Sequence, residues 1–188
     1  PVVEGKHIDP FAVRLDDARW SIASGEAARR LGTRHGRPRL CYRDVAGASN
    51  RLTLIAAILP ADCVSTHTVF CLRTPLPITA QQFLCGLFNS FVLNYLVRLR
   101  VNTHVTTAIV ERLPVPTRDM APGAFEEIAG LARRMAPGTG KSILAELNVR
   151  VASLYQLARH EFAHVLATFP LVPQADRDAT LAAFDEHA

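Results

Sequence analysis

The chain has 188 residues, of which 49% are hydrophobic and 20% are charged, and it carries a formal net charge of +4. This length fits one or two domains, and the composition supports a packed core and excludes a disordered tail. The longest apolar run, residues 84–97, is too short to span a bilayer, so we expect no membrane segment.

The first third of the chain predicts short strands and an exposed basic loop. Residues 2–17 alternate in polarity as strands do, around a turn at Gly5 and Lys6. Residues 24–39 predict a helix followed by a polar, arginine-rich loop. Three further strands are predicted over residues 39–45, 52–60 and 67–74, with a turn at 46–50 before the second and Pro60 at its end.

The clearest predicted element is one long helix over residues 79–99. Its apolar residues recur at helical spacing from Phe83 to Leu99. Thr79 and Gln82 have the spacing of a capping box at its start. A loop over residues 101–107 and a short strand over 108–116, closed by two prolines, are expected to follow.

From Met120 onward the sequence predicts helices only, over residues 124–135, 143–158, 160–168 and 176–184. We therefore expect an α+β fold in two parts. Residues 1–118 would form a mixed sheet with a long core helix, and residues 119–188 a small helical tail.

The charge divides at the same boundary. Residues 1–118 hold 15 Lys and Arg against 8 Asp and Glu, a net +7, whereas residues 119–188 hold 6 against 9, a net −3. Lys6 and Lys141 are the only lysines. Arginine suits bidentate contacts with phosphate and with guanine edges, although charge alone fits a solvated basic surface equally well.

Two short motifs suggest other chemistry. HEFAH, residues 160–164, is a formal HExxH, which on a helix places His160 and His164 on one face with Glu161 as a general base for zinc-bound water. It lacks a convincing third ligand downstream, and the alternative is an amphipathic helix with Phe162 inward. PGTGKS, residues 137–142, has Met135 where a phosphate-binding loop needs glycine, so we interpret it as a linker.

Several signatures are missing from the sequence. The four cysteines form no CxxC pair, which favours reduced, mostly buried thiols over a zinc ribbon. Neither an Asn-Pro-Pro-aromatic tetrapeptide nor a glycine-rich loop for S-adenosylmethionine occurs. No signal peptide opens the chain and no Met begins it, so we expect a fragment of a longer cytoplasmic protein.

Four stretches, which span almost the whole chain, resemble a known family. They are EGKHIDPF (4–11), YRDVAGASNRLTLIAAILP (42–60), LFNSFVLNYLVRLRVNTHVTTAIVERLPVP (87–116) and LYQLARHEFAHVLATFPLVP (154–173). They are similar to the TaqI-like specificity domain, the C-terminal target recognition region of bacterial type II and IIG restriction-modification methylases. In that family the stretch that contains HEFAH is simply helical.

The resemblance implies that this chain reads double-stranded DNA and is not itself an enzyme. Its parent would be an S-adenosylmethionine-dependent DNA adenine-N6 methyltransferase, alone or fused to an endonuclease. The upstream methyltransferase domain would flip and methylate the adenine and hold the cofactor, so no cofactor and no metal is expected in this chain. The alternatives are a small zinc hydrolase that uses HEFAH and a protein-interaction module that docks through the acidic tail.

We expect the DNA contacts to come from residues 1–118. The loop over 101–107 and Asn50 would approach base edges, and the arginines would hold phosphate. The exposed basic loop also contains Arg34. The candidate DNA-binding residues are Lys6, His7, Arg37, Arg39, Arg43, Asn50, Arg51, Arg98, Arg100, Asn102, Thr103, His104 and Thr106.

Overall fold

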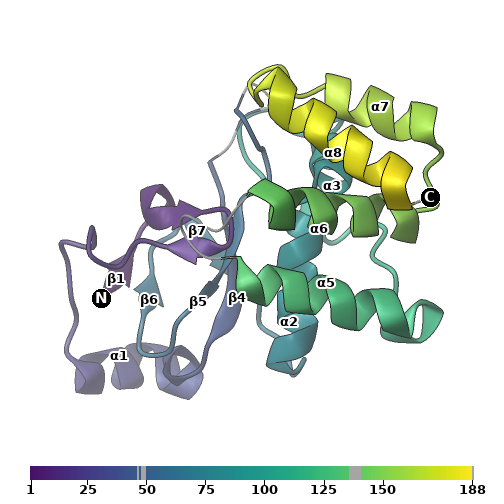
Figure 1. The fold of residues 1–188 in the computed structure, drawn as a ribbon. Coiled ribbons are helices and arrows are strands. Elements are labelled where there is room, and N and C mark those ends of the chain that lie inside the picture. The colour runs from purple at the N-terminus through teal and green to yellow at the C-terminus, as the bar shows by residue number, and fades with distance from the viewer. Residues whose placement is uncertain (46, 48–49, 136–140, 188) are drawn as a thin grey trace.

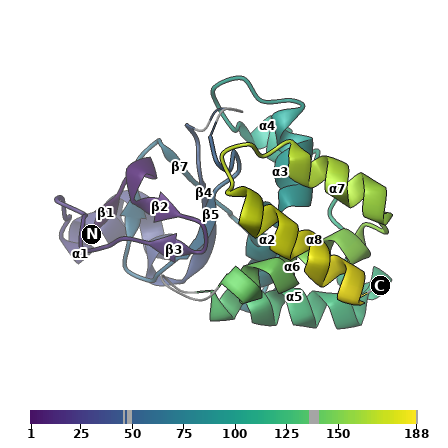
Figure 2. The same ribbon diagram turned by 45° about the horizontal axis from the view of Figure 1, so that its top comes forward.

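The computed structural model of the chain describes residues 1–45, 47, 50–135 and 141–187. The strands and the first helix, α1 (Ser24–Leu31), gather on one side, and most other helices gather on the opposite side (Figures 1 and 2). Helix α2 (Ile78–Phe88) contacts both groups. This arrangement is the mixed α+β fold that the sequence predicts.

The strands of the described residues form three small sheets. The central strand β4 (Arg39–Arg43) pairs antiparallel with β5 (Ala56–Leu59) on one side and with β7 (Val69–Cys71) on the other. The other two sheets have two strands each, β1 parallel to β6 and β2 antiparallel to β3, with bounds Val2–Val3, Val64–Ser65, Ile8–Asp9 and Ala12–Val13. The short helices η1 (Gly5–His7) and η2 (Gly32–Gly36) lie before β2 and β4.

Strand β5 begins at Ala56 and not at residue 52, where the sequence predicts it to begin. The reason is a buried amide. The side-chain oxygen of Asn94 accepts the backbone N–H groups of Thr53 and Leu54, each at 2.8 Å. These two residues therefore satisfy their donors on a helix and not on a neighbouring strand.

The predicted long helix over residues 79–99 is wrong, because the chain forms two helices there. Helix α2 ends at Phe88, and α3 (Phe91–Arg98) begins after the buried residues Asn89 and Ser90. The Ser90 hydroxyl accepts the N–H of Leu93, so it caps α3. The expected cap at Thr79 is also wrong, since Pro77 occupies the N-cap of α2.

The predicted strand over residues 108–116 is wrong as well. The chain turns at Thr106 into the short helix α4 (Thr107–Val110). The N–H groups of Val110 and Glu111 donate to the carbonyls of Thr106 and Thr107 at 3.2 and 2.8 Å, which is helical and not strand pairing. The apolar side chains and two prolines of this segment suggested a strand. In the structure Ile109 and Val110 instead pack on the main core from the short helix α4.

The predicted helices of the C-terminal part are confirmed within a few residues. The short helix η3 (Arg118–Met120) precedes four helices, α5 (Pro122–Arg134), α6 (Lys141–Leu154), α7 (Arg159–Ala167) and α8 (Gln174–His187). The first four residues of PGTGKS lie outside the described residues, and the last two open α6. Within the described chain, no helix combines the length and apolarity that a bilayer crossing needs.

One large apolar cluster crosses the expected boundary at residue 118. It runs from Leu40 on β4 through α2 to α5, where the rings of Phe83 and Phe125 lie 4.6 Å apart. Gly86 lets α2 approach α5, because a Cβ there would lie 2.7 Å from Cγ2 of Ile128. The sheet side and the helical tail therefore share a core.

We predict that Asn94→Ala destabilises the fold by about 3 kcal/mol or more, since each buried group left without a partner costs about 1–3 kcal/mol. The Asn94 amide also donates to the carbonyls of Phe88 and Ser90, at 2.9 and 2.8 Å, so the substitution affects four backbone groups. Urea unfolding followed by circular dichroism measures the loss. The exposed Asn102→Ala is the control, and equal stability of the two variants would contradict this role of Asn94.

Candidate nucleic-acid interface

The structure places most predicted DNA-binding residues at the end of β4 that leads to the loop around residue 50. Two segments meet there. Val45 forms an isolated bridge with His104, and the N–H of Val105 donates to the carbonyl of Asp44 at 2.8 Å. We call this group the loop cluster; its members are Arg43, Asn50, Arg51, Arg98, Arg100, Asn102, Thr103, His104 and Thr106.

Arg98 holds the loop cluster together. Its Nη1 donates to the carbonyl of Thr168 at 2.6 Å, its Nε donates to the Thr53 hydroxyl at 3.2 Å, and its Nη2 donates to the carbonyls of Asn50 and Arg51. The guanidinium also lies over the Phe169 ring, 4.0 Å from its centroid. Burial lowers the pKa of Arg98. Since all three nitrogens donate inside the molecule, Arg98 supports the loop and is not placed to hold a phosphate.

The loop over residues 101–107 presents polar side chains to solvent from this support. Asn102, Thr103, His104 and Thr106 are exposed. The Nδ1 atom of His104 lies 3.0 Å from a carboxylate oxygen of Asp44, which ties the loop to the end of β4. Arg100 is exposed and donates to the carbonyl of Leu96 at 2.7 Å. These side chains are therefore accessible groups on an anchored loop.

Other predicted contacts in this region are oriented inward or already paired. His7 is wrong as a contact residue, because its side chain is buried and its Nδ1 accepts the N–H of Glu4 at 3.0 Å. The neighbouring Lys6 pairs with Glu4 at 2.7 Å. Arg43 is half-buried, and its Nε is buried with no hydrogen-bond partner in the described part of the chain.

A second basic group lies at the opposite end of β4, roughly 13 Å away at the usual rise of a strand. Arg37 and Arg39, which the sequence predicts as contacts, line a groove of about 770 Å³. Arg30, Arg34 and Arg73 line it as well. We call this feature the arginine groove.

The arginine groove has no acidic lining among the residues that the structure describes. Arg30 pairs with Glu26 on the same helix, and Arg39 donates to the carbonyls of Cys63 and Arg37 at 2.8 and 3.3 Å. Arg34, Arg37 and Arg73 have exposed or half-exposed side chains. Apart from Arg30, the arginines of the groove have no carboxylate partner among the described residues, and this concentration of positive charge favours a polyanion.

Sequence reasoning missed Arg30 and Arg73 as members of this groove. Arg30 lies on α1, and Arg73 follows β7, whose pairing with β4 brings it to Arg39. A basic residue just after a strand, in a segment that also contains Thr74 and two prolines, was the available signal. This signal did not place Arg73 beside Arg39, because β7 pairs with β4, which lies about thirty residues earlier in the sequence.

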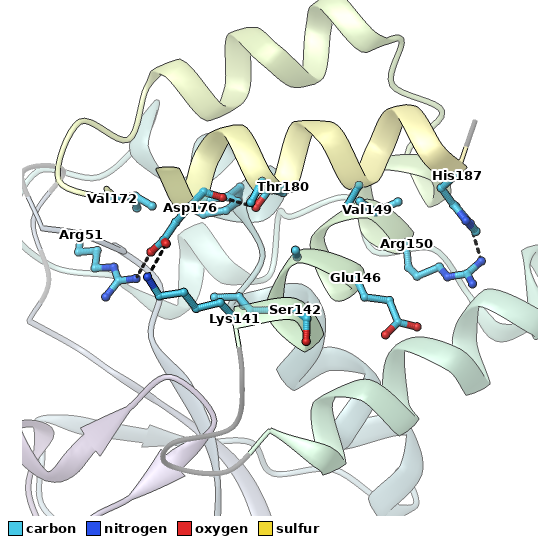
Figure 3. A pocket seen from close by; sticks show the side chains of 15 residues that line it. Arg51, Lys141, Ser142, Glu146, Val149, Arg150, Val172, Asp176, Thr180 and His187 are labelled. Atoms are coloured by element: carbon cyan, nitrogen blue, oxygen red, sulfur yellow. Dashed lines mark hydrogen bonds and ion pairs between the residues drawn. The ribbon is translucent and has the colours of Figure 1, made fainter. Parts of the chain in front are cut away.

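A second cavity, of about 560 Å³, lies between α6 and α8 (Figure 3). Its lining includes Phe91, Val149 and Val172. At one end Lys141 lies 2.7 Å from Asp176, toward which Arg51 also points at 3.9 Å.

At the other end of this cavity, Nη1 of Arg150 lies 2.6 Å from Nε2 of His187. Arg150 also pairs with Glu127 of α5 at 3.2 Å. The charged groups of the cavity therefore largely pair with one another. Arg51, a predicted phosphate contact, faces this cavity and α8.

HEFAH lies on α7 with His160, Glu161 and His164 exposed. The Glu161 carboxylate accepts the N–H of Ala158 at 2.7 Å, so it caps its own helix. The Nε2 atom of His164 lies 3.5 Å from the hydroxyl of Tyr95. In the described ranges, no three His, Cys, Asp or Glu side chains are grouped as metal ligands.

Comparisons of the chain with protein-family models, with curated proteins and with solved structures find no match. A proposal for the function therefore rests on the geometry of the loop cluster and the arginine groove.

We predict that Arg98→Ala lowers the free energy of unfolding by about 2–3 kcal/mol, because hydrogen bonds to charged groups are worth about 1.5–3 kcal/mol. Arg100→Ala, two residues away and exposed, should change stability by less than about 0.5 kcal/mol. Thermal and urea unfolding of both variants provide the measurement. A stable Arg98→Ala protein would show that the guanidinium is not a structural anchor.

Proposed function

We propose that this chain is the target recognition module of a restriction-modification DNA adenine-N6 methyltransferase. In this proposal the chain binds double-stranded DNA in the cytoplasm and positions it for an upstream methyltransferase domain of the same polypeptide. S-adenosylmethionine would bind to that domain and not to this chain. The observation that carries the proposal is the arginine groove, which combines five guanidinium groups with no carboxylate in its described lining.

The chemistry of the arginine groove suits a DNA backbone. One guanidinium group can donate two parallel hydrogen bonds to a phosphate, and it remains charged at any physiological pH. Arg34 and Arg37 come from η2 and the residue after it, and Arg73 follows β7, so the fold brings two distant segments together on one surface. Contacts of this kind position a duplex and supply affinity, but they read no sequence.

The loop cluster supplies the groups that read bases in this proposal. Asn102 and His104 can donate to or accept from base edges, and Thr103 and Thr106 add hydroxyl groups. The loop that carries them is tied to Asp44 by the His104 side chain and by the N–H of Val105. Arg98, which precedes the loop on α3, binds the neighbouring segment at Asn50 and Arg51. An anchored loop orders the reading groups before binding, which reduces the entropic cost of recognition.

We predict that Arg37→Ala and Arg73→Ala each weaken binding to a duplex of mixed sequence. Each lost phosphate contact should also reduce the slope of log K against log salt by about 0.9. Fluorescence anisotropy at several salt concentrations measures both quantities. Arg133→Ala, an exposed arginine on α5 away from the groove, is the matched control for net charge. Equal losses in all three variants would contradict a phosphate site in the groove.

We further predict that His104→Ala changes which sequences are bound and leaves the salt dependence unchanged. Selection from a randomised duplex library, with the original chain and the variant in parallel, measures the preference at each base position. Arg100→Ala, by contrast, should weaken binding to all sequences to a similar degree. An unchanged preference in the His104 variant would remove the loop over residues 101–107 from the reading surface.

A further inference from the structure

Cys41 and Cys71 lie directly opposite each other on the paired strands β4 and β7. The flanking residues show which kind of pair this is. The N–H of Leu72 donates to the carbonyl of Leu40 at 2.8 Å, which makes Leu40 and Leu72 a hydrogen-bonded pair. Since the two kinds of pair alternate along an antiparallel ladder, Cys41 and Cys71 form a non-hydrogen-bonded pair.

A non-hydrogen-bonded pair suits a disulfide. Its Cα atoms lie about 4.5 Å apart, inside the range of about 4.4–6.8 Å that disulfides span. Residues opposite each other on paired strands point to the same face of the sheet. Both cysteines accordingly pack on the smaller apolar cluster around Val3, Ile8 and Leu59. Both sulfurs are free in the structure.

The two thiols differ in their access to solvent. Cys41 is fully buried, and burial raises its pKa well above the ordinary value, so it stays protonated. Cys71 is half-buried and lines the arginine groove, and its sulfur lies 3.4 Å from the Ser65 hydroxyl. A small oxidant that enters the groove therefore reaches Cys71 first, and Cys41 lies beside it on the neighbouring strand.

We infer that Cys41 and Cys71 are a modification site, a dithiol that hydrogen peroxide or another hydroperoxide oxidises to a reversible cross-strand disulfide. The Cys71 thiolate attacks one peroxide oxygen, the O–O bond breaks, and water leaves after protonation, which gives a sulfenic acid on Cys71. The Cys41 sulfur then attacks the Cys71 sulfur, the S–O bond breaks, and the Cys41 proton leaves with the hydroxyl group as water. Two thiols and one hydrogen peroxide thus give one disulfide and two waters, and another hydroperoxide gives its alcohol in place of the first water.

The disulfide would link β4 to β7 at the wall of the arginine groove. This chemistry does not depend on the proposed function, because it requires only the strand pairing and access to Cys71. Failure to bind DNA would therefore leave the disulfide proposal intact, and failure to form the disulfide would leave the DNA proposal intact.

The test treats the folded chain with hydrogen peroxide, blocks the remaining thiols with iodoacetamide, and digests without reductant. Trypsin releases Cys41 in peptide 40–43, whereas Cys63 and Cys71 share peptide 52–73. The experiment therefore uses Cys63→Ser, so that any link between the two peptides identifies Cys71. We expect this linked peptide, the loss of two free thiols per chain, and full recovery of both thiols with dithiothreitol.

Two controls keep the result interpretable. Cys71→Ser, made in the chain that retains Cys63, should abolish the link, and its hydroxyl can still contact Ser65, so its fold is expected to persist. Cys85, which is buried and released in peptide 74–98, must stay unoxidised throughout and reports that the chain remains folded. Oxidation of Cys71 to sulfinic acid without a link, a link that persists in Cys71→Ser, or thiols that resist peroxide would each overturn the inference.

Discussion

The buried amide of Asn94 is the interaction on which the two sides of this protein depend. It lies on α3, in the helical part, and binds the backbone of Thr53 and Leu54, just before β5. Asn89 extends the same connection, because its side-chain oxygen accepts the N–H of Ala56 at 3.1 Å and its amide donates to the carbonyl there at 2.8 Å. Two asparagines thus take the place of a strand beside this segment, and buried polar networks of this kind require every member to be satisfied.

This connection also determines where the loop cluster lies. Asn94 is one helical turn before Arg98, so the anchored segment at Thr53 places the carbonyls of Asn50 and Arg51 within reach of the guanidinium. The loop over residues 101–107 leaves the same helix end and binds Asp44 through His104. The exposed polar side chains of that loop are therefore positioned by contacts that begin at a buried amide.

The loop cluster and the arginine groove differ in whether their arginines bond within the fold or face solvent. In the loop cluster the guanidinium of Arg98 donates its hydrogen bonds within the molecule, and Arg51 faces Asp176. In the arginine groove Arg34, Arg37 and Arg73 face solvent beside one another without an acidic neighbour in the described lining. Cys71 lines the same groove, so a small oxidant reaches it through the arginine groove.

Local pattern predicted much of the fold. The helical spacing of apolar residues located α5 to α8, and the arginine-rich stretch after residue 24 located α1 and the turn that follows. The same periodicity could not show the break at Asn89 and Ser90, since both flanking helices bury their stripes in one core and the stripe continues across the break. It could not show the late start of β5 either, because Asn94 lies about forty residues away in sequence.

For the candidate site, too, some features follow from the sequence and others only from the tertiary structure. The sequence by itself determined which residues are cationic, that they are concentrated before residue 118, and that residues 101–107 form a polar loop. Only the tertiary structure decided that His7 is buried, that Arg98 is an anchor, and that Arg73 joins Arg37 in a groove. The physical reason is that a side chain's charge is a property of its type, whereas its freedom to bind a ligand depends on partners that the fold brings from distant parts of the chain.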